Sequence, residues 1–248
     1  MADEMDTSGW YGPAMNIHRT AFAGRNFEYY SEDGVLSGVM ASNAIKGAQD
    51  RGVYAYMKHF ALNDQEGNRA SMVATWSNEQ AIREIYLKPF EISVKDADCH
   101  AVMSSFNYIG TRWTGGCKEL LKNVLRGEWG FVGFVETDYF GVSGYMTADQ
   151  CVRNGNDLML GYGSYESNEL DSSSATLVNA MRQACKNILY TVANSGYYAD
   201  GETTEAVNHM DELFKTVNTA AIAILGVLEL ALLIQLALQV RKQKKNKA

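Results

Sequence analysis

Residues 130–141 read GFVGFVETDYFG, and this stretch indicates how the chain folds. A short apolar run, Phe131–Val135, has the composition of a buried strand, and Asp138 follows where that strand should end. Parallel α/β folds place catalytic groups at the carboxyl ends of their strands. Thr137-Asp138 before a loop is also typical of an Asx turn or a helix N-cap. The surrounding sequence has to decide between these interpretations.

Segments that favour strands alternate with segments that favour helices along the first 193 residues. Short β-rich runs follow Gly9 and occupy Val53–Met57, His100–Ser104 and Asp157–Leu160. Apolar residues at helical spacing, with ordinary start and stop residues, predict the helices 35–49, 77–94, 118–129, 146–155 and 175–193. This alternation predicts βαβ units around a parallel sheet, an α/β fold.

Two features interrupt this pattern. Pro89 should end or bend the helix predicted over 77–94, because proline lacks the backbone N–H that a helix interior needs. The polar segment Leu62–Ser77 is longer than most connections between secondary-structure elements. Since long structureless loops are usually functional, this segment is expected to contribute to a site.

The composition excludes several classes of protein. The 248 residues carry a net charge of −7 with no basic face outside the final tail, which argues against a nucleic-acid partner. Four widely spaced cysteines without a Cys-x-x-Cys pair indicate neither a disulfide framework nor a zinc site. The acidic amino terminus lacks the apolar core of a signal peptide. One large or two small globular domains fit the length.

The carboxyl end has a different composition. Residues 217–240 contain an apolar run of about the length that crosses a bilayer as a helix, with Glu229 as its one charged residue. A basic tail, 241–248, follows, and it should stay cytoplasmic while the globular part, 1–193, lies outside. Residues 194–216 would be a stalk. The alternative for the apolar run is a buried or partner-binding helix, and Glu229 keeps this alternative open.

Polar groups recur where the predicted strands end, and in a βα barrel all such ends open on one face. The residues concerned are Arg25, Lys58, His59, Arg69, Phe106, Asn107 and Asp138. Each also has an ordinary structural interpretation: Arg25 could cap a helix, Lys58-His59 could be surface charge, and Arg69 could pair with Glu66. Their joint placement after strands favours a site.

Such a site would suit a polyhydroxylated ligand. A carboxylate at Asp138, surrounded by two arginines, a lysine and a histidine, should stay ionised at neutral pH. The cationic groups can hydrogen-bond sugar hydroxyls, and Phe106 and Tyr139 offer apolar walls. A carbohydrate is therefore the expected ligand.

Between residues 9 and 193 the following motifs occur in this order: GPAMNIHR, GRNFEYYSED, KHFALNDQEGNR, REIYLKPFE, VMSSFN, LLKNVLRGEWGF and GFVETD. This ordered set resembles glycoside hydrolase family 3, the β-glucosidase-like exo-glycosidases. The resemblance implies that Asp138 is the nucleophile. It also implies that the −1 sugar subsite is formed by Arg25, Lys58, His59, Arg69, Met103 and Phe106.

The resemblance further implies the fold and the chemistry. The fold would be an incomplete TIM-like (β/α)8 barrel lacking its first strands. Asp138 would attack the anomeric carbon, an acid would protonate the leaving oxygen, and water would then resolve the glycosyl-enzyme. No metal and no organic cofactor is implied.

The sequence departs from the family pattern in three ways. Tyr139 stands where tryptophan is common and Phe106 where tyrosine is common, which should retune the subsite walls. The first barrel strands, with an aspartate that binds the −1 sugar, are expected to be missing. The loop after Lys58-His59 reads ALNDQEGNR, without the His-Asp dyad of the β-N-acetylhexosaminidase branch. In this respect the chain resembles the two-domain branch of the family, which implies an acid/base glutamate on a second, upstream α/β domain.

Three hypotheses follow. The first is the carboxyl-terminal part of a permuted, membrane-anchored bacterial β-glycosidase, with an extracellular globular part if an upstream export signal is present. The second is a catalytically inactive truncated barrel that binds a sugar or a partner domain at the membrane. The third is a scaffold that assembles through its carboxyl-terminal helix.

Overall fold

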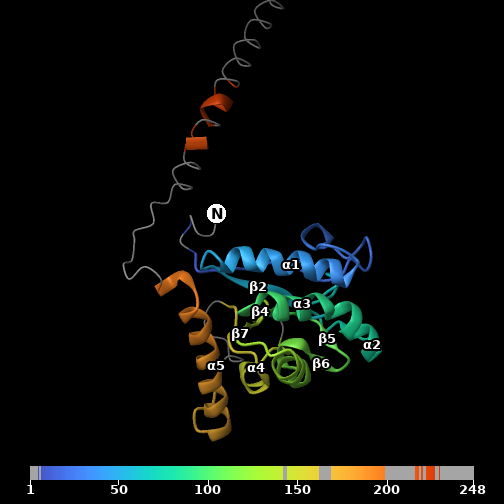
Figure 1. The fold of residues 1–248 in the computed structure, drawn as a ribbon, viewed down its shortest axis with the longest axis vertical. Helices are drawn as coiled ribbons and strands as arrows, with labels where there is room; N and C mark the ends of the chain where they lie inside the picture. The colour runs from blue at the N-terminus through green and yellow to red at the C-terminus, as the bar shows by residue number, and fades with distance from the viewer. Residues whose placement is uncertain are drawn as a thin grey trace, which may run out of the picture. The chain divides into compact units, whose positions relative to one another are not determined.

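The computed structural model describes residues 5, 7–141, 144–161 and 169–198, together with 216, 217, 219, 222–226 and 229. The chain divides into two compact units, and the larger one contains the described residues between 7 and 198. All the strands described below belong to this larger unit, which Figure 1 shows as a sheet with helices packed against it.

The central sheet has four parallel strands in the order β1 (Gly9–Trp10), β2 (Tyr54–Phe60), β4 (Ala101–Ser104) and β7 (Phe134–Glu136). The predicted α/β class and the parallel sheet are confirmed. The strand predicted over Asp157–Leu160 is reduced to one parallel bridge between Leu158 and Glu136.

The strand predicted over Phe131–Val135 begins later, at Phe134. Gly133 explains the shift, because its φ is 147° and a Cβ there would lie 2.1 Å from the His100 carbonyl oxygen. Only glycine allows the chain to approach the entrance of β4 so closely. Phe131 is buried in the core without being part of the strand.

One face of the sheet is covered by helices α1 (Gly34–Gln49) and α3 (Lys88–Ala97) and by the π-helix η5 (Glu119–Glu128). Figure 1 shows α1 running above β2. Asp33 caps α1 by accepting bonds from the Val35 and Leu36 N–H groups, which satisfies donors that a helix start leaves unpaired. The buried core between these elements includes Ala41, Ile45, Ala55, Met57, Phe90, Val94, Val102, Leu121, Leu125 and Val135.

The helix predicted over 77–94 is three consecutive pieces, α2 (Glu79–Ala81), the π-helix η3 (Ile82–Tyr86) and α3. Asn78 caps α2 by accepting from the Ala81 N–H. The break precedes Pro89, which lies in the first turn of α3, where a missing N–H leaves no helical bond unmade. The prediction that Pro89 ends or bends a helix therefore placed the break slightly too late.

The other face of the sheet carries an aromatic cluster. The Tyr54, Tyr56 and Phe134 rings pack together with centroids 5.3 to 5.9 Å apart, and the Tyr11 ring lies 4.7 Å from Tyr56. Ile188 of the predicted helix α5 (Ala175–Ala193) packs beside them. The helix predicted over 146–155 is α4 (Ala148–Asn154).

The long segment Leu62–Ser77 contains a strand that was not predicted. A small sheet joins β3 (Ala74–Thr75), β5 (Tyr108–Ile109) and β6 (Arg112–Trp113) in that order. Short helical turns complete the described elements: η2 (Asn26–Glu28), η4 (Thr114–Gly116) and η7 (Gly196–Tyr198).

The predicted membrane helix, 217–240, and the basic tail, 241–248, lie largely outside the described residues. The predicted stalk, 194–216, is described only at its two ends. Within the described ranges, no helix is both long and apolar enough to cross a bilayer.

Candidate active site

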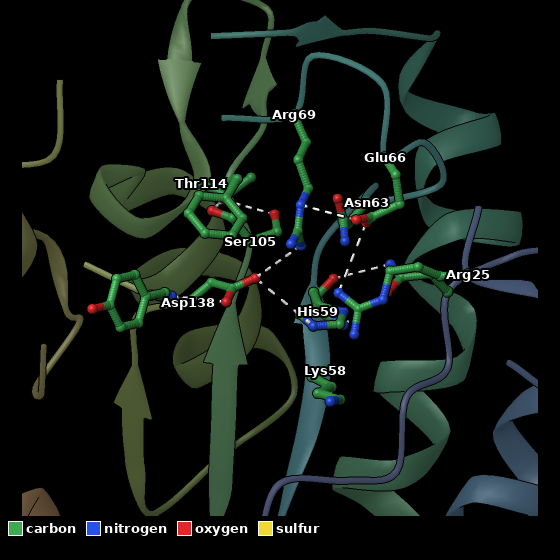
Figure 2. Close-up of polar contacts among 12 residues, drawn as sticks. Arg25, Lys58, His59, Asn63, Glu66, Arg69, Ser105, Thr114 and Asp138 are labelled. Atoms are coloured by element: carbon green, nitrogen blue, oxygen red, sulfur yellow. Dashed lines mark hydrogen bonds and ion pairs between the residues drawn. The ribbon is translucent and has the colours of Figure 1, made fainter. Parts of the chain in front are cut away.

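The predicted site residues meet at the carboxyl end of the sheet, as Figure 2 shows. Asp138 lies two residues beyond the end of β7, and His59 lies near the end of β2. Arg69 extends from the loop after β2 and reaches between Glu66 and Asp138. Arg25 comes from the loop before η2. Side chains separated by more than one hundred residues of sequence are thus brought to one place.

The end of β2 is irregular, and this irregularity serves the site. The register between β2 and β4 shifts between Met57 and Phe60. In a regular strand, neighbouring side chains point to opposite faces, whereas a bulge changes their directions. At this irregular end Lys58 contacts Glu28 and His59 contacts Asp138. Asn16 holds this segment, because its amide donates to the His59 carbonyl at 2.9 Å and accepts from the His59 N–H at 2.8 Å.

The Asp138 carboxylate has three neighbours. Its Oδ2 lies 3.5 Å from Arg69 Nη1 and 3.8 Å from His59 Nε2, and its Oδ1 accepts the Tyr139 N–H at 2.8 Å. The structure thus places Asp138 just beyond the strand end and also gives it a local turn-like hydrogen bond, while its catalytic role stays a prediction. One oxygen makes a local turn-like bond, and the other faces the converging basic groups.

The titration of this site is governed mainly by burial. Burial is the largest cause that raises the pKa of Asp138 above 3.8, and the Tyr139 N–H, Arg69, Arg25 and Lys58 oppose it. Ionisation of Asp138 at neutral pH stays a prediction.

His59 corrects one expectation. Burial, followed by Arg25, Lys58 and Arg69, lowers its pKa well below 6.5, so it is a neutral ring and not a cation. Its Nδ1 is buried without a hydrogen-bond partner among the described residues.

Two acidic residues were not predicted as part of the site. Glu28 is ion-paired with Arg25 and lies 3.6 Å from Lys58. Glu66 lies 3.0 Å from Arg69 and 3.8 Å from Arg25. The i,i+3 spacing of Arg25-Glu28 and of Glu66-Arg69 was the available signal, and pairing of Arg69 with Glu66 had been considered only as an alternative to a role in the site.

The remaining predicted residues occupy three different settings. The Phe106 ring lies beneath the Arg69 guanidinium, 4.6 Å from centroid to Cζ, which is cation–π contact distance. Tyr139 is partly exposed beside Asp138. Met103 is buried on β4, opposite Glu136 in the sheet register. Their sugar-binding roles stay predictions.

Asn107 supports the loops around the site and does not reach its centre. Its amide donates to the Ala61 carbonyl at 3.1 Å and to the Thr75 hydroxyl at 3.0 Å. It thereby ties the small sheet to the end of β2. Asn63, labelled beside Glu66 in Figure 2, is buried with neither side-chain polar atom hydrogen-bonded within the described part of the chain.

A buried carboxyl, Glu136, was also missed. It lies two residues before Asp138, and its Oε1 is 3.4 Å from the Tyr11 hydroxyl, which donates to it. Burial, with a smaller contribution from Asp138, raises the pKa of Glu136 to about 7. No sequence signal distinguished this glutamate from an ordinary strand residue. Across the described residues, no group of three or more His, Cys, Asp or Glu side chains is arranged to hold a metal ion.

Comparison with known protein families identifies the family of this chain. Residues 1–184 match the glycosyl hydrolase family 3 N-terminal domain. The chain belongs to glycosyl hydrolase family 3. The resemblance inferred from the motifs is confirmed, and the described sheet is part of the family's N-terminal barrel domain.

Family 3 relatives share the sequence and the fold. The chain is 42% identical to β-glucosidase A of Butyrivibrio fibrisolvens over 66% of this chain and 19% of that protein. It is 35% identical to β-glucosidase B of Emericella nidulans over 91% of this chain and 28% of that protein. Among solved structures, β-glucosidase 3B of Thermotoga neapolitana in complex with α-D-glucose matches with a TM-score of 0.70. That match has 37% identity and covers 80% of this chain and 29% of that chain. The chain thus spans less than a third of each of these proteins.

Proposed function

We propose that the chain carries the nucleophile and part of the sugar subsite of a retaining, exo-acting β-glucosidase-like enzyme. The observation that supports this most is the position of Asp138, whose Oδ2 faces Arg69 and His59 at the carboxyl end of the sheet. Membership of family 3 supports the substrate class, because the two relatives compared above are β-glucosidases. A solved relative in complex with glucose supports a terminal glucosyl unit as the ligand.

In the proposed reaction, Asp138 forms a bond to the anomeric carbon while the bond from that carbon to the leaving oxygen breaks. An acid donates its proton to the leaving oxygen. The same group, now a base, takes a proton from water, which attacks the anomeric carbon and releases the sugar and the Asp138 carboxylate. The acid/base is proposed to come from a glutamate on a second α/β domain.

The basic residues of the site bind and orient the sugar in this proposal. Arg25, Lys58 and Arg69 donate charge-assisted hydrogen bonds to hydroxyl groups, and Phe106 forms a wall below Arg69. Neutral His59 can donate or accept, because an imidazole that is not protonated carries one donor and one acceptor nitrogen. None of these steps requires a metal or an organic cofactor.

The membrane-anchored arrangement is a further part of the proposal. The apolar composition of residues 217–240 and the basic residues after them support a single-pass anchor with the globular part outside the cell. A permuted order of domains, with the acid-bearing domain before the barrel, would leave the anchor at the carboxyl end.

Inactivation by 2,4-dinitrophenyl 2-deoxy-2-fluoro-β-glucoside tests the proposal. Its leaving group departs without protonation, so the first step needs Asp138 but not the acid/base. We expect time-dependent gain of one fluoroglucosyl mass by the full chain and none by Asp138→Asn. Glucose binding that weakens in Arg25→Ala and Lys58→Ala, without any covalent gain, would favour the inactive sugar-binding barrel instead.

A further inference from the structure

The basic groups of the site are linked to carboxylates in one continuous chain of contacts. Lys58 contacts Glu28, which pairs with Arg25, and Arg25 in turn contacts Glu66. Glu66 continues the chain to Arg69, and Arg69 reaches Asp138. Three cations and three carboxylates therefore alternate across the site, as the dashed lines from Arg25 to Asp138 in Figure 2 partly show.

Glu66 occupies the centre of this chain of contacts. Its Oε2 lies 3.0 Å from Arg69 Nε, and its Oε1 lies 3.8 Å from Arg25 Nη1. Arg69 Nη1, on the other branch of the same guanidinium, lies 3.5 Å from Asp138 Oδ2. One planar guanidinium thus spans Glu66 and the proposed nucleophile, which fixes its plane and direction.

The backbone of Glu66 is itself held in place. Its N–H donates to the Ala23 carbonyl at 2.9 Å, which joins the loop after β2 to the loop that carries Arg25. Gly24 packs against its side chain, since a Cβ built on Gly24 would lie 3.0 Å from Glu66 Cγ. The Glu66 carbonyl also accepts from the Arg69 N–H at 3.2 Å. The carboxylate is therefore presented from a constrained position between two loops.

We propose that Glu66 is a positioning residue that aims Arg25 and Arg69 at the −1 sugar and holds the Arg69 guanidinium against Asp138. The inference rests on the proposed function for its sugar-binding part. A surface ion pair typically contributes little, because water screens it and two long side chains must be ordered. Glu66 differs from the acidic member of such a surface pair, because its Oε1 is buried and has no hydrogen-bond partner within the described part of the chain. It also bridges two guanidinium groups instead of one.

The charge of Glu66 also acts on the nucleophile. The groups around Asp138 are Arg69, His59 and the Tyr139 N–H, with Arg25, Lys58 and Glu136 further away. An anion at Glu66 offsets the positive charge of Arg69 and repels a second anion at Asp138. Glutamine is neutral but keeps a carbonyl oxygen that can accept from Arg69 Nε, so Glu66→Gln should lower the pKa of Asp138.

The experiment measures the ionisation of Asp138 directly. The full chain is labelled with 13C at the aspartate carboxyls, and the Asp138 resonance is assigned with Asp138→Asn and followed against pH. Glu66→Gln is compared with Glu128→Gln, which removes a carboxylate paired with Arg83 outside the site. Glu66→Ala is the second variant at the same position. The inhibition constant and the maximum rate of inactivation by the fluoroglucoside are measured separately for each protein.

We expect Glu66→Gln to lower the pKa of Asp138. Glu66→Ala also releases Arg69, so its Asp138 pKa should lie above that of Glu66→Gln. Both variants should raise the inhibition constant at least tenfold, while Glu128→Gln changes neither quantity. A purely structural role would lower stability without shifting the Asp138 titration. An Asp138 pKa in Glu66→Gln that stays within about 0.2 units of its value in the unchanged chain would overturn the inference. If no protein reacts with the fluoroglucoside even when a family 3 acid-bearing domain is supplied, the proposed function fails, and the titration alone still decides the role of Glu66.

Discussion

Replacing Arg69 by methionine should raise the pKa of Asp138 further above its ordinary value. Arg69 Nη1 lies 3.5 Å from Asp138 Oδ2, and Arg69 is the first among the charged side chains that oppose the effect of burial. Methionine keeps much of the length that packs over Phe106 but carries no charge. The substitution therefore removes an attraction that favours the carboxylate over the neutral carboxyl.

The magnitude follows from Coulomb's law at the observed separation. Two unit charges 3.5 Å apart interact by about 1.2 kcal/mol in a dielectric of ~80 and about 2.4 kcal/mol in one of ~40. Both side chains are partly shielded from water, so we use this range and not the much larger values for a dry interior. It corresponds to a rise of about one to two pKa units.

Carbon-13 titration of the Asp138 carboxyl measures this shift without requiring activity. Arg83→Met is the matched control, because Arg83 is also paired with carboxylates, Glu79 and Glu128, but lies outside the site. The control should leave the Asp138 titration unchanged. An Arg69→Met protein that folds normally and titrates Asp138 at the same pH or lower would refute the electrostatic account of the site.

Three further predictions follow from buried or constrained residues. Since the pKa of Glu136 is raised to about 7 from 4.5, the folded state holds this proton more tightly than the unfolded chain. The protonated Glu136 therefore contributes stability at acid pH, and this contribution is lost as the pH rises from ~4.5 through ~7. In urea unfolding, Glu136→Gln should be more stable than the unchanged chain at pH 8 but not at pH 4. Asn16→Ala should destabilise the fold by about 2–3 kcal/mol in urea unfolding and weaken glucose binding, since it leaves the His59 N–H and carbonyl unpaired. A loss under ~0.5 kcal/mol would contradict this. Gly133→Ala should abolish cooperative thermal unfolding, because the alanine Cβ would lie 2.1 Å from the His100 carbonyl oxygen. In Gly130→Ala the Cβ would have no heavy atom within 4 Å, so the substitution should lower the free energy of unfolding by only about 1 kcal/mol. Equal melting curves for the two glycine variants would argue against the packing described at β7.

Elements with strong local signals could be predicted from the sequence. The helix over 175–193 has the predicted bounds, and α1 begins one residue before its prediction because Asp33 caps it. The alternation of strands and helices also predicted that the polar groups after successive strands lie on one face. The helix bounds depend on residues close together in the chain, so the sequence pattern contains the necessary information.

Features that depend on tertiary contacts could not be predicted. The late start of β7 results from the close approach of Gly133 to the His100 carbonyl oxygen. The small sheet forms only because β5 lies beside β3. The shift in register at the end of β2, which brings both Lys58 and His59 to the site, is likewise set by pairing with β4.

The electrostatics of the site were the least predictable part. The sequence suggested a carboxylate among cations, whereas the structure interleaves those cations with Glu28 and Glu66 and buries His59 as a neutral ring. Burial cannot be inferred from residue types alone. Glu136, a buried carboxyl two residues before Asp138, shows the same limit.

The location of the covalent sugar tests the central claim most directly. After reaction of the full chain with the dinitrophenyl fluoroglucoside, proteolysis and tandem mass spectrometry identify the modified side chain. The proposal predicts a single ester on Asp138 that disappears in Asp138→Asn and remains in Glu128→Gln. A sugar on any other residue, or no sugar even when a family 3 acid-bearing domain is supplied, would contradict it.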